Sequence, residues 1–158
     1  MKVAGINKND AVNGKGYSVS LFLQGCPHRC KGCFNSDTWD FDGGQDINNS
    51  DVIEEIIDAI QDNGIIRNFS VLGGEPLCPE NRADVAELVV AIRQSFPEIA
   101  IYAWTGYLFE DLKDENDKDL ESIFDNIDIL IDGPYKEDER DITLPLRGSR
   151  NQRIIQMN

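Results

Sequence analysis

Three of the four cysteines lie within eight residues, between Gly25 and Asn35. The segment reads GCPHRCKGCFN, so Cys26, Cys30 and Cys33 have the spacing C-x3-C-x2-C. Thiolates are soft ligands that suit zinc and iron–sulfur centres. Three cysteines on one short loop can bind three irons of a four-iron cubane, which leaves one iron without a protein ligand. A small molecule with an amine and a carboxylate can then chelate that open iron.

Other uses of these thiols stay open at this point. A structural zinc site would take its fourth ligand from His28 or Cys78, although zinc sites commonly draw their ligands from two separate pairs. A redox dithiol of Cys30 and Cys33 would leave Cys26 unexplained, and the thiols could also be ordinary core residues. We expect His28 to be a solvated loop residue and Cys78 to be a packed thiol.

Composition and charge exclude several classes of function. The 158 residues suit one domain, residues 1–158, with a single core. Asp and Glu total 29 against 15 Lys and Arg, a formal net charge of −14 that repels phosphate backbones, so we expect no nucleic-acid partner. No apolar run approaches the roughly 18 residues of a membrane helix, and we expect no secretory leader and no membrane partner. In a soluble cytoplasmic protein, clustered cysteines indicate metal or redox chemistry rather than disulfides.

Strands alternate with helices along the chain. β-branched and apolar runs predict strands at residues 17–24, 67–72, 99–104, 127–131 and 153–156. Apolar stripes with helical spacing predict helices over about 51–62 and 82–95, and the acidic stretch 107–124 predicts one or two short helices. Asn13-Gly14 is a turn signal for a hairpin with a short N-terminal strand. Ser50 is the expected N-cap of the first helix.

This alternation predicts an α/β fold built from parallel βαβ units with right-handed crossovers. Because an eight-unit barrel takes about 250 residues, we expect a partial, open barrel of about five or six units with a mostly parallel sheet. In such folds the chemistry lies at the C-terminal ends of the strands. The cysteine loop, Gly73-Gly74-Glu75-Pro76, Thr105-Gly106 and Asp132-Gly133-Pro134 all fall at such ends.

The C-x3-C-x2-C spacing after a first strand resembles the signature of the radical S-adenosylmethionine (SAM) superfamily. One position departs from it: the superfamily often has an aromatic residue directly before the third cysteine, whereas this chain has Gly32 there and Phe34 directly after Cys33. The segment CPHRCKGCFN is similar to the activating enzymes of glycyl-radical proteins, and most similar to the activators of anaerobic ribonucleoside-triphosphate reductase. The resemblance spans most of the chain, from residue 13 to Arg153.

The resemblance implies a [4Fe–4S] cluster held by the three clustered cysteines, with SAM at the open iron. In that superfamily a Gly-Gly-Glu motif binds the methionyl amine of SAM, which implies this role for Gly73, Gly74 and Glu75. Groups at the third cysteine lie near the adenine, which implies that role for Gly32, Cys33 and Phe34. An ordinary strand-to-helix turn is the alternative for residues 73–76.

The implied reaction is reductive cleavage of SAM to methionine and a 5′-deoxyadenosyl radical, which takes a hydrogen atom from a glycine Cα of a partner protein. No side chain is expected to serve as acid or base. The implied partners are the glycyl-radical subunit of anaerobic ribonucleoside-triphosphate reductase and a low-potential one-electron donor such as a flavodoxin. Asp132-Gly133-Pro134 and the basic segment Arg147–Arg153 also resemble parts of these activators, and the basic segment would serve either docking or SAM contact, or be a solvated loop.

Two other functions remain open from the residues alone. The chain could activate a different glycyl-radical enzyme, such as one of the formate-lyase type. It could also be a zinc-binding interaction module without catalysis, because zinc accepts the same thiolate ligands. Anaerobic reconstitution separates the zinc module from an activating enzyme, since an iron–sulfur cluster is brown and a zinc site is colourless.

Overall fold

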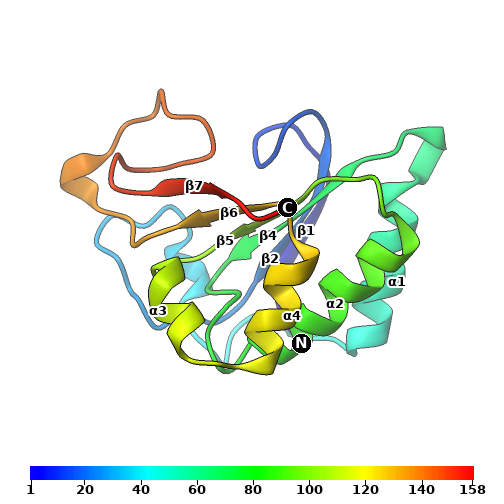
Figure 1. The fold of residues 1–158 in the computed structure, drawn as a ribbon, viewed down its shortest axis with the longest axis horizontal. Coiled ribbons are helices and arrows are strands. Elements are labelled where there is room, and N and C mark those ends of the chain that lie inside the picture. Colours follow the sequence, from blue (N-terminus) through cyan, green and yellow to red (C-terminus); the bar gives the residue numbers. More distant parts are fainter.

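The computed structural model describes all 158 residues, Met1–Asn158, and contains one seven-stranded sheet and four α-helices. Figure 1 shows the helices gathered on one face of the sheet, while two loops rise from the other face. The strand order is β3-β1-β2-β4-β5-β6-β7. The strands are β1 Lys2–Asp10, β2 Ser18–Leu23, β3 Gln45–Asp46, β4 Asn68–Gly73, β5 Ile101–Trp104, β6 Ile129–Asp132 and β7 Arg153–Gln156. The helices are α1 Asn49–Ile60, α2 Arg82–Ser95, α3 Phe109–Asp114 and α4 Lys118–Asn126.

The α/β class and the alternation of strands and helices are confirmed. Strands β2, β4, β5 and β6 are parallel neighbours, and helical segments link them in sequence. The sheet is open, as expected, but the partial barrel of about five or six units with a mostly parallel sheet is not confirmed, because the sheet is mixed. β1 and β7 pair antiparallel with their neighbours, and β3 pairs antiparallel with β1. The N-terminal hairpin and the returning last strand thus take sheet positions that further parallel units would occupy.

The two faces of the sheet have different side chains. Val19, Leu21 and Leu23 of β2 belong to the hydrophobic core under the helices. Because side chains alternate along a strand, Ser18, Ser20 and Phe22 face the other side. The loop 11–17 covers the two serines, which are fully buried, and its Lys15 N–H donates to the Tyr102 hydroxyl of β5 at 3.2 Å. This face of the sheet carries no α-helix (Figure 1).

The helix predictions are largely confirmed. α2 begins and ends as predicted, and the acidic stretch divides into α3 and α4 at Asn116, which has a φ of 51°. The N-cap prediction for Ser50 is wrong: α1 begins at Asn49 with Asn48 as its N-cap, and Ser50 lies inside the helix. Asparagine precedes a helix as readily as serine, so residue preference alone could not decide between them. None of the four helices combines the length and apolar character that crossing a bilayer requires.

The C-terminal ends of the four parallel strands meet at one edge of the sheet, as predicted. There the cysteine loop follows β2, Gly73-Gly74 ends β4, Thr105-Gly106 follows β5 and Gly133-Pro134 follows β6. Members of all four segments line one pocket. Parallel pairing produces this meeting, because it places every carboxyl end at the same edge.

Candidate metal centre

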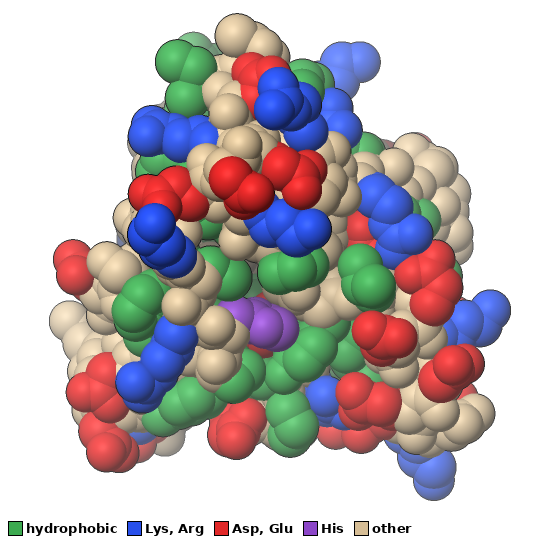
Figure 2. Space-filling view, turned by 90° about the vertical axis from the view of Figure 1, so that its left-hand side faces the viewer, with side chains coloured by type: hydrophobic (Ala, Val, Ile, Leu, Met, Phe, Trp, Pro, Cys, Tyr) green, Lys and Arg blue, Asp and Glu red, His purple; other side chains and the backbone are tan.

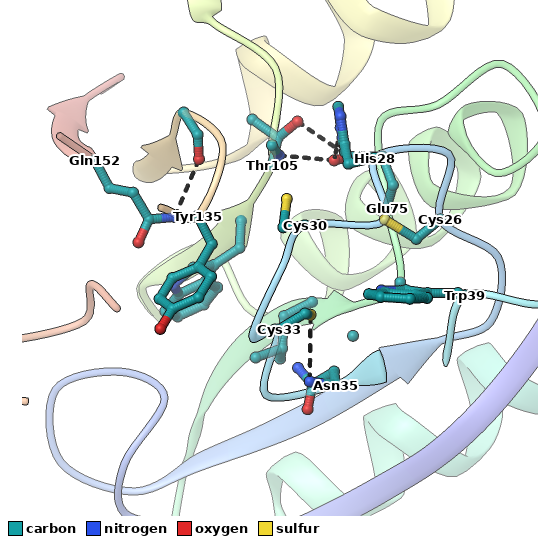
Figure 3. A pocket seen from close by; sticks show the side chains of 16 residues that line it. Cys26, His28, Cys30, Cys33, Asn35, Trp39, Glu75, Thr105, Tyr135 and Gln152 are labelled. Atoms are coloured by element: carbon teal, nitrogen blue, oxygen red, sulfur yellow. Dashed lines mark hydrogen bonds and ion pairs between the residues drawn. The ribbon is translucent and has the colours of Figure 1, made fainter. Parts of the chain in front are cut away.

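Cys26, Cys30 and Cys33 line one pocket of about 140 Å³ at this edge (Figure 3). Their thiols are partly exposed and form no disulfide. No three His, Cys, Asp or Glu side chains of the chain converge tightly enough to surround a single metal ion. The thiols are therefore spread around a cavity, and the pocket wall between them is completed by Trp39, Leu72 and the ends of β4 and β5.

The start of the cysteine loop is held by backbone hydrogen bonds to the segment that follows the loop. Gly25 N–H donates to the Thr38 carbonyl at 2.8 Å and Cys26 N–H to the Trp39 carbonyl at 3.1 Å. Gly25 has a φ of +94°, and a Cβ there would lie 2.3 Å from the Phe41 ring. The Asn35 N–H donates to the Cys33 sulfur at 3.4 Å. The segment that follows the loop thus folds back beside it and supports Cys26 and Cys33.

The turn after β4 lies directly against the start of the cysteine loop. Gly74 N–H donates to the Leu23 carbonyl and Glu75 N–H to the Gly25 carbonyl, both at 2.8 Å. A Cβ on Gly74 would lie 2.3 Å from the Gly25 carbonyl oxygen, so only glycine fits at this position. The Asn81 amide donates to the carbonyls of Gln24 and Glu75 at 3.2 and 3.0 Å. Backbone contact therefore fixes the distance between the turn and the cysteines.

The Glu75 carboxylate is buried and already has four hydrogen-bond partners. Its Oε1 accepts from Leu77 N–H at 2.9 Å and from the Thr105 hydroxyl at 2.8 Å. Its Oε2 accepts from Gly106 N–H at 2.7 Å and lies 2.9 Å from His28 Nε2. The carboxylate is 1% exposed, and these donors compensate the loss of water around its charge.

The expectation that His28 is a solvated loop residue is wrong. Its side chain is 18% exposed, bonds to Glu75 and packs edge-on against Tyr107 with ring centroids 4.4 Å apart. In Figure 2 the histidine lies in a hollow bordered by hydrophobic side chains. Local sequence gave no signal for this contact, because Glu75 lies 47 residues further along the chain.

Two of the pocket thiols, those of Cys26 and Cys30, are weaker acids than a free cysteine. Burial raises the pKa of Cys26 to about 11, and the nearby Glu75 carboxylate contributes to the rise. Burial also raises the pKa of Cys30, with Cys33 as a further cause. Metal binding must therefore displace thiol protons, which a thiophilic metal ion can do.

Cys78 is a packed thiol, as expected, and lies outside the pocket. It is fully buried and its Sγ–H donates to the Glu75 carbonyl at 3.1 Å. Burial raises its pKa to about 12. Cys78 is not among the residues that line the pocket shared by the other three cysteines.

A second, larger cavity of about 690 Å³ adjoins the cysteine pocket on the helix-free face of the sheet. Phe22, Leu72 and Trp104 lie along it, and the loops 11–17 and 141–148 border it. The two cavities share six residues: Cys33, Asn35, Leu72, Trp104, Tyr135 and Gln152. A molecule bound at the cysteines could therefore extend into the larger space.

The structure separates the residues predicted to contact SAM into three places. Gly73, Gly74 and Glu75 line the cysteine pocket, and Cys33 lines both cavities. Phe34 lines the larger cavity, where the Arg140 guanidinium lies 5.1 Å from the centre of its ring. Gly32 lines neither cavity and is exposed. Trp39 and Tyr135 also line the pocket and were not predicted, because nothing in their local sequence marks them. Gln152, which belongs to the basic segment Arg147–Arg153, lines the pocket as well.

Comparison with known proteins identifies the family. A family described as "4Fe-4S single cluster domain" matches residues 12–155. The anaerobic ribonucleoside-triphosphate reductase-activating protein of Enterobacteria phage T4 is 39% identical over 149 residues, which cover 92% of this chain and 87% of that protein. The proteins of the same name from Escherichia coli K12 and Haemophilus influenzae are 39% and 37% identical over 144 and 147 residues, at least 90% of each chain. The chain belongs to this family of activating proteins.

For a member of the reductase-activating family, the donor set fits an iron–sulfur cluster. The three thiols surround a pocket, and soft thiolates are the ligands that iron–sulfur clusters require. The Asn35 N–H bond to the Cys33 sulfur is of the kind that tunes such clusters. These residues therefore agree with the "4Fe-4S single cluster domain" description of the matching family.

The Asp132 and Arg153 side chains have a structural role in this activating-family chain. Asp132 is fully buried and accepts from Phe109 N–H at 2.8 Å and from Arg153 Nε at 2.9 Å. Arg153 also pairs with Glu110 of α3 at 2.7 Å. One end of the basic segment Arg147–Arg153 is thus anchored, while Arg147 at the other end lines the larger cavity.

Proposed function

We propose that this protein generates a glycyl radical on anaerobic ribonucleoside-triphosphate reductase by reductive cleavage of SAM at a [4Fe–4S] cluster. Residues 1–158 act as one radical SAM domain, and Cys26, Cys30 and Cys33 hold three of the four irons. One observation carries the proposal: in a member of the activating family, three thiols share a pocket with the Gly73-Gly74 turn at the carboxyl edge of a parallel sheet.

The chain's own residues bind and orient the reactants. When bound, a reduced cluster supplies one electron to the sulfonium of SAM, which yields methionine and a 5′-deoxyadenosyl radical. Gly73, Gly74 and Glu75 face the methionyl amine. The Gly74 carbonyl accepts no hydrogen bond from within the chain, so it is available to an ammonium group. The Glu75 carboxylate, with four donors of its own, holds the turn in place.

The adenosyl group of SAM lies toward the larger cavity. Cys33 and Phe34 line that cavity, and the Phe34 ring edge would contact the adenine there. The apolar walls at Phe22, Leu72 and Trp104 exclude water from a radical that would attack most C–H bonds. The 5′-deoxyadenosyl radical would take the hydrogen atom from a glycine Cα of the partner and so become 5′-deoxyadenosine. The transfer is downhill, because the flanking amides delocalise the spin of the glycyl radical.

The partner's glycine must reach this site from outside the chain. The helix-free face of the sheet offers the route, because the larger cavity opens there next to Cys33. The electron comes from a low-potential one-electron donor such as a flavodoxin. The cytoplasm holds both partners, and neither membrane nor nucleic acid takes part.

Anaerobic reconstitution with iron and sulfide tests the proposal. The expected product is a brown protein with close to four irons per chain that converts SAM to 5′-deoxyadenosine when a strong reductant is added. Incubation with the reductase should then give the doublet EPR signal of a glycyl radical. A colourless protein that retains zinc would favour the interaction module instead. A doublet that forms only with a formate-lyase type of partner would assign a different target.

A further inference from the structure

The segment between Cys26 and Cys30 has a single hydrogen bond to the rest of the fold. Neither Pro27 nor Arg29 bonds to another segment, and both are exposed. The bond between His28 Nε2 and Glu75 Oε2, 2.9 Å long, is the exception. Arg29 has a φ of 49°, which a non-glycine residue seldom adopts without support from its surroundings. The place of this segment therefore depends on the His28 side chain.

We propose that His28 is a positioning residue, which clamps the cysteine loop onto the ends of β4 and β5 through Glu75. This role rests on the proposed function, in which the loop holds the cluster at a fixed position relative to the Gly73-Gly74 turn. His28 lines the cysteine pocket, and its Nε2 is committed to Glu75, so we assign it no part in the reaction itself. It acts through Cys26 and Cys30, whose separation the 27–29 segment determines.

The anchor at the other end of this bond is rigid. Three donors besides His28 hold the Glu75 carboxylate: Leu77 N–H, the Thr105 hydroxyl and Gly106 N–H. Two of these donors, on Thr105 and Gly106, directly follow β5. Glu75 therefore links the ends of β4 and β5 independently of His28. Loss of His28 would leave this anchor in place and free only the loop.

The space around the ring suits an imidazole. Tyr107 packs against the ring at a 66° angle, and a Cβ on Gly106 would lie 2.5 Å from the ring carbon Cδ2. A glycine at 106 is therefore needed for the ring to reach Glu75. Because Nε2 is committed to Glu75, only Nδ1 of His28 would be left to bind a metal ion.

The apoprotein allows a direct test, because the chain contains one histidine. With ¹⁵N-labelled histidine, we expect one set of imidazole signals, with a proton on Nε2 that exchanges slowly with water and shifts on Glu75→Gln. Fast exchange of that proton, and no shift in the Glu75→Gln variant, would overturn the contact. This readout needs neither cluster nor SAM, so it holds even if the proposed function fails.

The reconstituted protein tests the positioning role. His28→Leu should lower kcat/KM for SAM cleavage by about 10- to 100-fold, as loss of an outer-shell partner does, and should change the EPR signal of the reduced cluster with SAM bound. His28→Gln, which retains an N–H donor near the same place, should recover most of this loss. Lys31→Gln is the control, because Lys31 is 90% exposed and pairs only with Glu137.

Two outcomes would contradict the positioning role. One is a His28→Leu variant with the wild-type EPR signal and unchanged KM for SAM. The other is a His28→Gln variant that recovers nothing while its thermal unfolding matches that of wild type. If His28→Leu does not fold, the EPR signal and the KM for SAM of His28→Gln are compared with those of Lys31→Gln instead. This comparison still tests the positioning role, because both variants keep a polar side chain on the loop. Failure of the wild type itself to make 5′-deoxyadenosine would instead refute the proposed function.

Discussion

At the scale of the residue, four chemically identical thiols have different surroundings. Cys26, Cys30 and Cys33 are partly exposed around a pocket, whereas Cys78 is fully buried against the Glu75 carbonyl. Burial raises the pKa of Cys78 to about 12, so it stays protonated and unreactive near neutral pH. Position in the fold therefore decides which thiols can become ligands.

This difference predicts the iron content of two matched variants. After anaerobic reconstitution, Cys30→Ser should lose most of its iron, because a serine oxygen is a hard ligand for an iron–sulfur cluster. Cys78→Ser should retain close to wild-type iron, since its side chain does not reach the pocket. Iron and sulfide analysis, with the visible spectrum, measures both. Loss of iron in Cys78→Ser would assign that thiol as a ligand and remove the open iron site.

Gly74→Ala should disturb the contact between the turn and the cysteine loop. The new Cβ would meet the Gly25 carbonyl oxygen at 2.3 Å, and backbone on both sides must then move. We expect the apoprotein to lose about 1–3 kcal/mol of unfolding free energy, as overpacked variants do. Urea unfolding measures the loss. Gly5→Ala is the control, because no atom lies within 4 Å of its added Cβ, and equal stability of the two variants would contradict the prediction.

At the scale of the element, α4 begins at a side-chain N-cap. The Asp117 carboxylate accepts from Asp119 N–H at 2.9 Å and from Leu120 N–H at 3.1 Å, and it lies 3.3 Å from Arg82. The hydrogen bond from Leu120 is the main cause that lowers the pKa of Asp117, and the Arg82 guanidinium lowers it further. The turn between α3 and α4 thus ends in a cap that needs its negative charge.

Asp117→Ala should cost about 1 kcal/mol of unfolding free energy at pH 7, the usual loss for an N-cap. Because the pKa of Asp117 is lower in the folded chain than the value of about 3.9 in unfolded chains, its stabilisation is present above about pH 4. It disappears as the pH falls through the folded pKa. Thermal unfolding at pH 7 and pH 3 measures the stability difference between Asp117→Ala and wild type, with the exposed Asp114→Ala as control. A stability difference that grows toward pH 3 would contradict the prediction.

At the scale of the whole molecule, the last strand is tied to the rest of the sheet by a buried charge. Arg153 of β7 bonds to Asp132 of β6 and to Glu110 of α3, and Asp132 is fully buried. Gln152 lies in both cavities and its amide donates to the Gly133 carbonyl at 3.1 Å. Because Gln152 directly precedes β7, the position of β7 determines one wall of the two cavities.

Arg153→Met should destabilise the apoprotein by about 2 kcal/mol, because it leaves the buried Asp132 carboxylate with fewer partners. Relative to wild type, the backbone amides of β7 should exchange faster with solvent in this variant, and those of α2 should change less. Arg150→Met is the control, since the Arg150 side chain is exposed and makes no ion pair shorter than 4.0 Å. Unchanged stability and unchanged exchange in Arg153→Met would mean that the Asp132 charge is compensated elsewhere.

Much of the fold could be predicted from local sequence. The bounds of α2 and β7, and the meeting of four loops at one sheet edge, follow from periodicity and from parallel pairing. The number of barrel units could not be predicted, because the direction in which β1, β3 and β7 join the sheet depends on long-range pairing. The N-cap of α1 was missed, because Asn48 and Ser50 are equally suited to a cap.

The sequence by itself determined the chemistry of the candidate ligands, because the thiol type and the C-x3-C-x2-C spacing are local properties that do not depend on how the chain folds. Only the tertiary structure decided which side chains support those ligands. His28 meets Glu75 across 47 residues, and the Glu75 carboxylate receives donors from β5 as well. Such contacts leave no local pattern, because they arise when parallel strands bring their ends together and bury a charge that must then find partners.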